Sequence, residues 1–209
     1  MKIHGISIPG GKSPAKMVGA AILVAVLGVG GWYLKNKFLP KKGVISYASL
    51  SVDKSKPLAD DLYKGLGKDA TKWKRDATFW SLNLHAVRMD GTVDVSKPAV
   101  IEYVSPLNSA SGSKKTRSDS LRKYTASGDG VRGKSWGWNE PVRDLEPHRT
   151  PACSIKQLLG KLSSEGVLKT PTVRVFFDPK FADFYAWTLF VEGEPKPKSY
   201  SWENCEQIK

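Results

Sequence analysis

The uncharged segment from Met17 to Leu34 constrains this 209-residue chain more than any other feature of its sequence. It holds 18 residues without a charge, and lysines border it at Lys16 and Lys35. At a rise of about 1.5 Å per residue, a helix of this length spans about 27 Å, close to the thickness of a bilayer's hydrocarbon core. The segment therefore predicts a transmembrane helix with the lipid bilayer as its partner, and we favour this over a buried core helix or a cleaved signal peptide.

The lysines that flank this segment are similar in number on its two sides, so the positive-inside rule does not fix the orientation of the helix. A short tail at 1–16 followed by the span and a much larger C-terminal part is typical of an uncleaved signal-anchor. We therefore expect a single-pass membrane protein with a cytoplasmic N-terminus and an extracytoplasmic C-terminal domain. The alternative is the opposite orientation, with a domain that faces the cytoplasm.

The net charge of +13 is concentrated in two short parts of the chain. Residues 1–42 contain seven lysines and no acidic residue, and residues 105–134 contain seven basic and two acidic residues. Bases and acids nearly balance over the rest of the chain. The charge therefore does not indicate a basic nucleic-acid-binding domain, because it flanks the predicted membrane helix or lies in one segment.

Two segments of the C-terminal part share one order of expected elements: a helix, a strand, a turn, a strand and a shorter strand. In the first, Trp80, Leu82 and Leu84 alternate with polar residues, which is the period of a strand with one wet face. In the second, Ser154 is a typical N-cap of a helix and Gly166 is a typical C-terminal stop. Each half buries little by itself, so we expect the two to pack together as one core.

These features predict an α+β fold in which a single transmembrane helix precedes a domain of two helix-plus-antiparallel-hairpin halves. The expected organisation is a tail at 1–16, the transmembrane helix at 17–34, a basic linker at 35–51 and the domain at 52–209, with halves 57–104 and 154–205 joined by a basic loop at 105–134 and a segment at 135–153.

This element order resembles the PepSY-like modules of bacterial extracytoplasmic proteins, which are helix-plus-hairpin repeats that are often tethered to a membrane. The resemblance covers the two halves and includes the turn segment from Asp90 to Asp94. It implies a membrane-anchored protein of the bacterial envelope with a periplasmic domain. It implies location and architecture rather than a particular activity.

The basic segment 105–134 is rich in Ser, Gly, Lys and Arg, and we expect a long surface loop or a weak edge hairpin around Leu121 and Tyr124. A solvated loop is the ordinary interpretation of such a segment. If it binds anything, the candidates are an anionic envelope surface or polysaccharide, an acidic protein and, least favoured, nucleic acid. The candidate binding surface consists of Lys114, Lys115, Arg117, Arg122, Lys123, Arg132, Lys134, Trp136 and Trp138.

The two cysteines of the chain offer two interpretations. A bridge between Cys153 and Cys205 would close a loop of about 50 residues. The alternative to this bridge is two separate buried thiols. The second interpretation is a cysteine nucleophile, because Cys153 lies at an expected helix N-terminus and His148 lies five residues before it. We favour the bridge.

No spaced group of histidines, cysteines or carboxylates indicates a metal site, and we expect no catalytic residue, cofactor or metal. The sequence therefore predicts a membrane-anchored extracytoplasmic binding or scaffolding domain without catalytic activity, with a protein of the envelope as its partner. The alternatives are a cytoplasm-facing, membrane-tethered basic adaptor that binds anionic surfaces or nucleic acid, and a tethered cysteine hydrolase.

Overall fold

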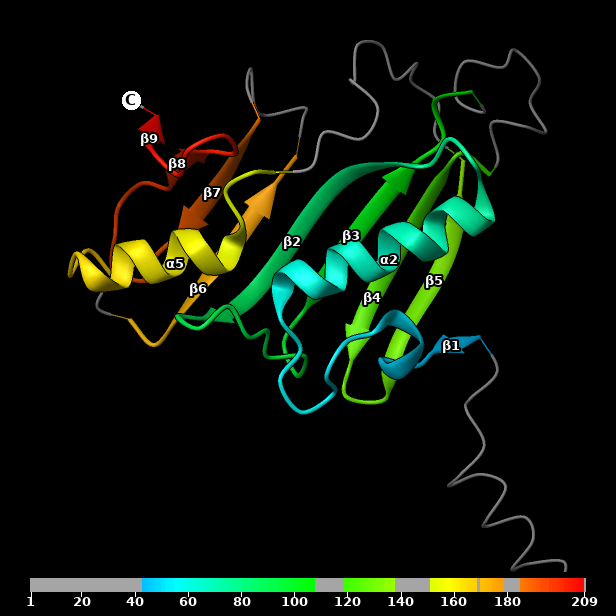
Figure 1. Ribbon diagram of the computed structural model, residues 1–209, viewed down its shortest axis with the longest axis horizontal. Helices are drawn as coiled ribbons and strands as arrows, with labels where there is room; N and C mark the ends of the chain where they lie inside the picture. The colour runs from blue at the N-terminus through cyan, green and yellow to red at the C-terminus, as the bar shows by residue number, and fades with distance from the viewer. Residues whose placement is uncertain (1–42, 108–118, 138–150, 169, 179–184, 209) are drawn as a thin grey trace, which may run out of the picture. The chain divides into compact units, whose positions relative to one another are not determined.

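The computed structural model describes residues 43–107, 119–137, 151–168, 170–178 and 185–208 (Figure 1). These residues form one antiparallel sheet of nine strands and two α-helices. The strands follow the spatial order β1-β5-β4-β3-β2-β6-β7-β8-β9. Their bounds are β1 (Val44–Ile45), β2 (Thr78–Arg88), β3 (Ala99–Val104), β4 (Leu121–Ser127), β5 (Gly130–Trp136), β6 (Thr172–Phe177), β7 (Ala186–Phe190), β8 (Lys198–Ser201) and β9 (Gln207–Ile208).

Helix α2 (Ala59–Trp73) buries one face against the sheet. Its buried side chains include Leu62, Leu66 and Ala70, which recur every four residues as the helical period requires. Position 65 within this helix requires glycine, because the close approach of Leu50 leaves no room for a larger side chain. A short 3₁₀ turn, η1 (Ala48–Leu50), supplies that contact.

Helix α5 (Ile155–Ser164) begins where its capping residues predict. The Ser154 hydroxyl accepts from the Gln157 amide, and the Gln157 side chain accepts from the Ser154 amide, which completes a capping box. Gly166 adopts a positive φ of 69° just after the helix ends. The apolar positions Ile155, Leu158, Leu159 and Leu162 are all buried.

The predicted α+β fold of two helix-plus-hairpin halves, each with its own small sheet, is wrong, because β2 joins both parts of the chain into one sheet. On one side β2 pairs with β3, and on the other side it pairs with β6, so that Leu84 lies opposite both Ala99 and Val175. The alternation of a strand indicates which face is buried but not which strand lies at either edge. Pairing β2 with β6 satisfies the backbone groups that two separate sheets would leave exposed at their edges.

Of the two alternatives expected for 105–134, the structure has the hairpin around Leu121 and Tyr124, but not at an edge of the sheet. Residues of this segment form β4 and β5, which pair with each other along their whole lengths. Strand β4 also pairs with β3, and β5 pairs with β1, so neither strand is an edge of the sheet. The segment is polar because Lys123, Arg132 and Lys134 lie on one face of the two strands, whereas Tyr124, Ala126 and Val131 on the other face are buried.

No helix that the structure describes has the length and apolar character needed to cross a bilayer. This finding contradicts the predicted location as a single-pass membrane protein with a periplasmic domain. The two described helices use their apolar residues against the sheet instead. The segment on which that prediction rested, 17–34, lies outside the described residues, as do the tail 1–16 and most of the linker 35–51.

Both helices lie on the same face of the sheet (Figure 1). Between them and the strands lies one large core, in which the aromatic rings of Phe79, Phe177, Trp187 and Trp202 contact one another. On the opposite face, the described residues place no helix. That face, called the open face here, therefore presents the alternate side chains of the strands.

Candidate binding face

Strand alternation and register bring four of the predicted binding residues together on the open face. Lys123 lies opposite Lys134, and Arg132 and Trp136 follow at alternate positions of β5. Because successive side chains of a strand point to opposite faces, these four share the face that carries no helix. We call this group, Lys123, Arg132, Lys134 and Trp136, the β4–β5 patch.

The β4–β5 patch carries an excess of positive charge. The Lys123 Nζ lies 3.8 Å from Glu102 Oε1, and Glu102 also accepts a hydrogen bond of 2.7 Å from the Ser81 hydroxyl. Within the described residues, no ion pair involves Arg132 or Lys134. One carboxylate therefore accompanies three cations.

Trp136 gives the patch an exposed aromatic side chain. It is 43% exposed, which is high for the largest apolar side chain. The Lys134 ammonium lies 4.5 Å from the centroid of its ring, a cation–π contact that covers one side of the indole. The patch thus combines cations with a partly exposed aromatic anchor.

Arg122, which the sequence grouped with these residues, lies on the helix side of the sheet. Its Nε donates to the Tyr124 hydroxyl at 2.9 Å, and that hydroxyl donates to Asp69 Oδ2 at 2.8 Å. Arg122 Nη2 also lies 3.7 Å from Asp69 Oδ2, and the guanidinium stacks near the ring of Trp73. Burial and the bond to Asp69 raise the pKa of Tyr124 well above its usual value. Arg122 therefore joins β4 to α2 and is not part of a binding surface.

The remaining predicted members of the surface cannot be placed. Lys114, Lys115, Arg117 and Trp138 lie outside the described residues, and so does His148.

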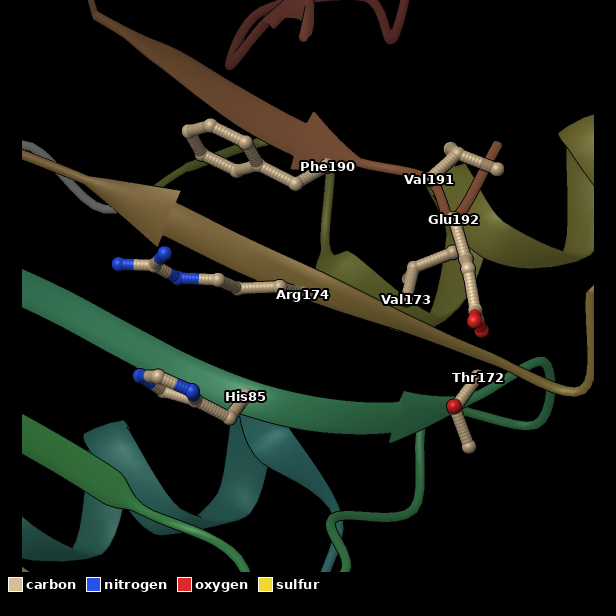
Figure 2. A pocket seen from close by; sticks show the side chains of 7 residues that line it. All are labelled: His85, Thr172, Val173, Arg174, Phe190, Val191 and Glu192. Carbon is tan, nitrogen blue, oxygen red and sulfur yellow. The ribbon is translucent and has the colours of Figure 1, made fainter. Parts of the chain in front are cut away.

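A second feature of the open face, a pocket around Arg174 of β6, was not found from the sequence (Figure 2). Its volume is about 260 Å³. Figure 2 shows the Arg174 side chain between those of Phe190 and His85, which come from β7 and β2. The lining residues are His85, Thr172, Val173, Arg174, Phe190, Val191 and Glu192.

The sequence contained only a weak signal for this pocket. Arg174 alternates with the buried Val173 and Val175, which placed it on a wet face but did not distinguish it from any other surface arginine. His85 and Glu192 come from distant parts of the chain, so only the pairing of β2, β6 and β7 brings them beside Arg174.

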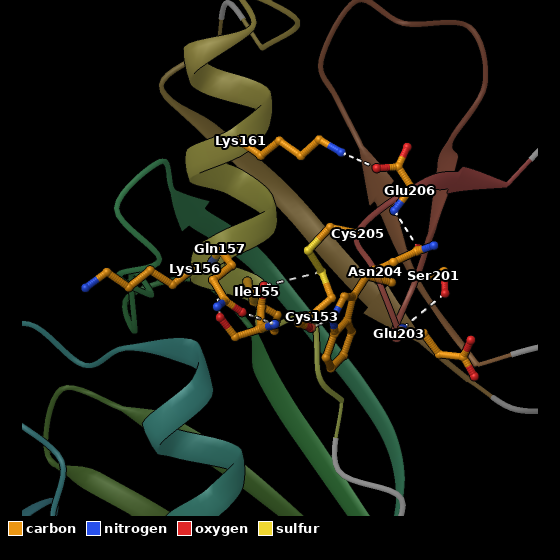
Figure 3. The surroundings of a disulfide bond; sticks show 12 residues. Cys153, Ile155, Lys156, Gln157, Lys161, Ser201, Glu203, Asn204, Cys205 and Glu206 are labelled. Carbon is orange, nitrogen blue, oxygen red and sulfur yellow. Dashed lines mark hydrogen bonds and ion pairs between the residues drawn. A yellow bond between two sulfur atoms is a disulfide. The ribbon is translucent and has the colours of Figure 1, made fainter.

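Cys153 and Cys205, the predicted pair, lie at disulfide distance, with their Cα atoms 5.3 Å apart and their sulfurs bonded (Figure 3). The surrounding contacts fix Cys153 further: its amide donates to the Trp202 carbonyl at 2.7 Å, and its carbonyl accepts from Trp187 Nε1 at 2.8 Å. Nearby, Lys161 Nζ lies 2.7 Å from Glu206. The bond ties the start of α5 to the end of the sheet, and it occupies the thiol that the nucleophile hypothesis requires.

The described residues contain no group of three His, Cys, Asp or Glu side chains that could hold a metal ion. Comparison with protein-family models, with curated proteins and with solved structures finds no match to this chain. The resemblance to PepSY-like modules therefore stays a prediction.

Proposed function

We propose that this chain is a non-catalytic binding domain and that its β4–β5 patch binds an acidic segment of a protein partner. The observation that carries the proposal is the local charge imbalance: three cations share this part of the open face with one carboxylate, Glu102. A partner with carboxylates at matching positions gains from charge complementarity, which speeds association and excludes basic partners.

The aromatic residue of the patch supports a protein over a nucleic acid as the partner. Protein interfaces are enriched in Trp and Arg, and a partly exposed Trp rimmed by polar residues is a common anchor of such interfaces. Single-stranded nucleic acids instead need aromatic rings on which bases can stack. One side of the Trp136 ring is already occupied by the Lys134 ammonium.

The non-catalytic part of the proposal is supported by the state of Cys153. This residue was the strongest nucleophile candidate in the sequence, but its sulfur is bonded to Cys205. A bonded sulfur has no thiolate with which to attack a substrate.

The test uses the full chain and a short fluorescent peptide of Glu, Ser and Leu. We expect saturable binding that weakens with added salt, and a loss of about tenfold or more in the Arg132→Glu/Lys134→Glu variant. The matched control is Lys64→Glu/Lys68→Glu, which changes the charge equally on the exposed side of α2 and should leave the affinity unchanged.

Three outcomes would overturn the proposal. The first is equal loss of binding in the α2 control, which would show a non-specific charge effect. The second is tighter binding of a single-stranded oligonucleotide of the same length than of the acidic peptide. The third is a concentration-dependent dimer that dissociates in the Arg132→Glu/Lys134→Glu variant, since the patch would then contact a second copy of the chain.

A further inference from the structure

The guanidinium of Arg174 is held in one orientation on the open face. Its Nε donates to Asn83 Oδ1 at 2.9 Å. Its plane lies near two rings, with the guanidinium carbon 5.8 Å from the centroid of Phe176 and 5.0 Å from that of Phe190. An arginine that is already fixed in this way loses little further side-chain freedom when it binds a ligand.

The same guanidinium retains donors for a ligand. Of its five N–H groups, the bond to Asn83 uses the one on Nε, which leaves those on the two terminal nitrogens. Among the described residues, no carboxylate lies within ion-pair distance of Arg174. A fixed arginine whose charge has no carboxylate partner, beside a pocket, is the arrangement that recognises planar oxyanions with two parallel hydrogen bonds.

We propose that the Arg174 pocket binds a carboxylate group. The pocket volume of about 260 Å³ suits a carboxylate with a few attached carbons. Figure 2 shows the His85 ring on one side of Arg174, whereas Glu192 and Thr172 lie toward the other end of the pocket. The Glu192 carboxylate disfavours ligands with more negative charge, so a singly charged carboxylate binds better than a phosphate dianion.

The carboxylate has two chemical sources, an acidic side chain of a protein partner or a small organic acid. The first source rests on the proposed function, because the pocket and the β4–β5 patch share the open face and an acidic segment could engage both. The second source does not depend on the patch. The experiment therefore treats the two sources in separate arms.

In the first arm, the full chain is titrated with N-acetylglutamate amide, with propionate and with inorganic phosphate, and the NMR signals of the Arg174 Nε–H and the His85 ring are followed. We expect saturable shifts with both carboxylates and weaker binding of phosphate. Arg174→Gln should weaken carboxylate binding about tenfold or more, since it removes a charge-assisted bidentate contact. Arg75→Gln, in the exposed turn after α2 and outside both the pocket and the β4–β5 patch, is the matched control and should have no effect.

Arg174→Lys distinguishes bidentate hydrogen bonding by the guanidinium from simple attraction between charges. Lysine keeps the charge but loses both the Asn83 bond and the bidentate geometry, so we expect most of the binding to be lost. If Arg174→Gln does not fold, Asn83→Ala and Phe190→Ala provide the test, because each frees the guanidinium and should weaken carboxylate binding several-fold. Unchanged affinity in these variants, shifts spread evenly over the basic residues, or tighter binding of phosphate would overturn the proposal.

In the second arm, the acidic peptide is tested against Arg174→Gln and Arg132→Glu/Lys134→Glu. Peptide binding that depends on the patch but not on Arg174, with no small-carboxylate shifts, would reject the pocket and leave the proposed function intact. Small-carboxylate binding at Arg174 without any peptide binding would reject the proposed function and retain the pocket as a site for a free organic acid. Loss of peptide affinity in both variants would assign the carboxylate to a side chain of the partner.

Discussion

The carboxylate of Asp60, in the first turn of α2, accepts a hydrogen bond of 3.0 Å from the backbone amide of Ile155, the first residue of α5. Its other oxygen accepts from the amide of Lys156, also at 3.0 Å. Asp60 is 7% exposed, so water does not compete well for these bonds. One buried side chain thus places a negative charge at the N-termini of both helices, where the helix dipoles favour it.

Replacement of Asp60 should therefore destabilise the whole domain. We expect Asp60→Ala to lower the free energy of unfolding by about 1–3 kcal/mol, because two buried amides lose their acceptors. The control is Asp61→Ala, which removes a carboxylate from the same helical turn but from an exposed position. Urea denaturation measures both variants. Equal losses in the two would show that only the dipole of α2 is involved and not the contact with α5.

Reduction of the disulfide should have a larger effect. The bond between Cys153 and Cys205 spans 52 residues, and a loop of that length corresponds to about 4 kcal/mol in the chain-entropy model. We expect the urea midpoint of the native protein to fall when dithiothreitol is added. The Cys153→Ala/Cys205→Ala variant should show the lower midpoint with or without the reductant. A midpoint that does not respond to the reductant in the native protein would contradict this prediction.

Replacement of the adjacent residues Arg122 and Lys123 of β4 should affect different properties of the domain. Arg122 contacts Tyr124 and Asp69 on the helix side, so Arg122→Ala should cost about 1–3 kcal/mol of stability through the partly buried charge of Asp69. Lys123 lies on the open face with a side chain that is 39% exposed, and its pair with Glu102 should contribute less than about 1 kcal/mol. Thermal unfolding and peptide binding together test this: Arg122→Ala should change mainly stability, and Lys123→Ala mainly affinity. The reverse pattern would contradict the placement of Arg122 on the helix side and Lys123 on the open face.

The glycines of the two helices differ in the space around them. A Cβ added to Gly65 would lie 2.5 Å from the backbone oxygen of Leu50, whereas one added to Gly160 of α5 would meet nothing within 4 Å. We therefore expect Gly65→Ala to destabilise the domain and Gly160→Ala to stabilise it by up to about 1 kcal/mol through helix propensity. Differential scanning calorimetry of the two variants gives the sign directly. Stabilisation by Gly65→Ala would mean that Leu50 does not pack against α2.

Alkaline pH should unfold the domain through its buried tyrosines. Burial raises the pKa of Tyr63, Tyr103 and Tyr124 above the ordinary value near 10. A raised pKa in the folded state means that the stability from these groups is intact below about pH 10 and declines as the pH rises above it.

Absorbance at 295 nm follows this ionisation. In urea, all tyrosines should titrate near pH 10, whereas in the native protein these three should ionise at higher pH, together with the loss of circular dichroism. Tyr103→Phe should reduce the resistant fraction by one tyrosine. Complete ionisation near pH 10 in a protein that is still folded would contradict the burial of these side chains.

Some features of the fold could be predicted because they depend on neighbouring residues alone. The start of α5 at Ser154 and its stop before Gly166 are local signals, and the structure has both. The alternation of Leu82 and Leu84 with polar residues likewise identified the buried face of β2. The hairpin of β4 and β5 was expected only as a weak alternative to a loop, because charged residues on the open face and glycines near the turn conceal two strands whose other face is buried.

The candidate site was predictable only in part. The sequence placed Arg122 and Lys123 in one basic group, although strand alternation would have separated them if β4 had been recognised. The Arg174 pocket could not be found, because its neighbour Asn83 lies 91 residues earlier in the chain. The partners of Asp60 on α5 are likewise 95 and 96 residues away in sequence.

The sequence alone therefore determined where helices and several strands begin, which side of each is apolar, and that the two cysteines could form a bridge. Only the tertiary structure decided that β2 joins both parts into one sheet, that one face of this sheet carries neither of the two described helices, and which cations share that face. The physical reason is that periodicity and capping are local, whereas strand pairing and register are set by contacts between residues far apart in the chain. The same long-range pairing that buries the core determines the composition of the open face.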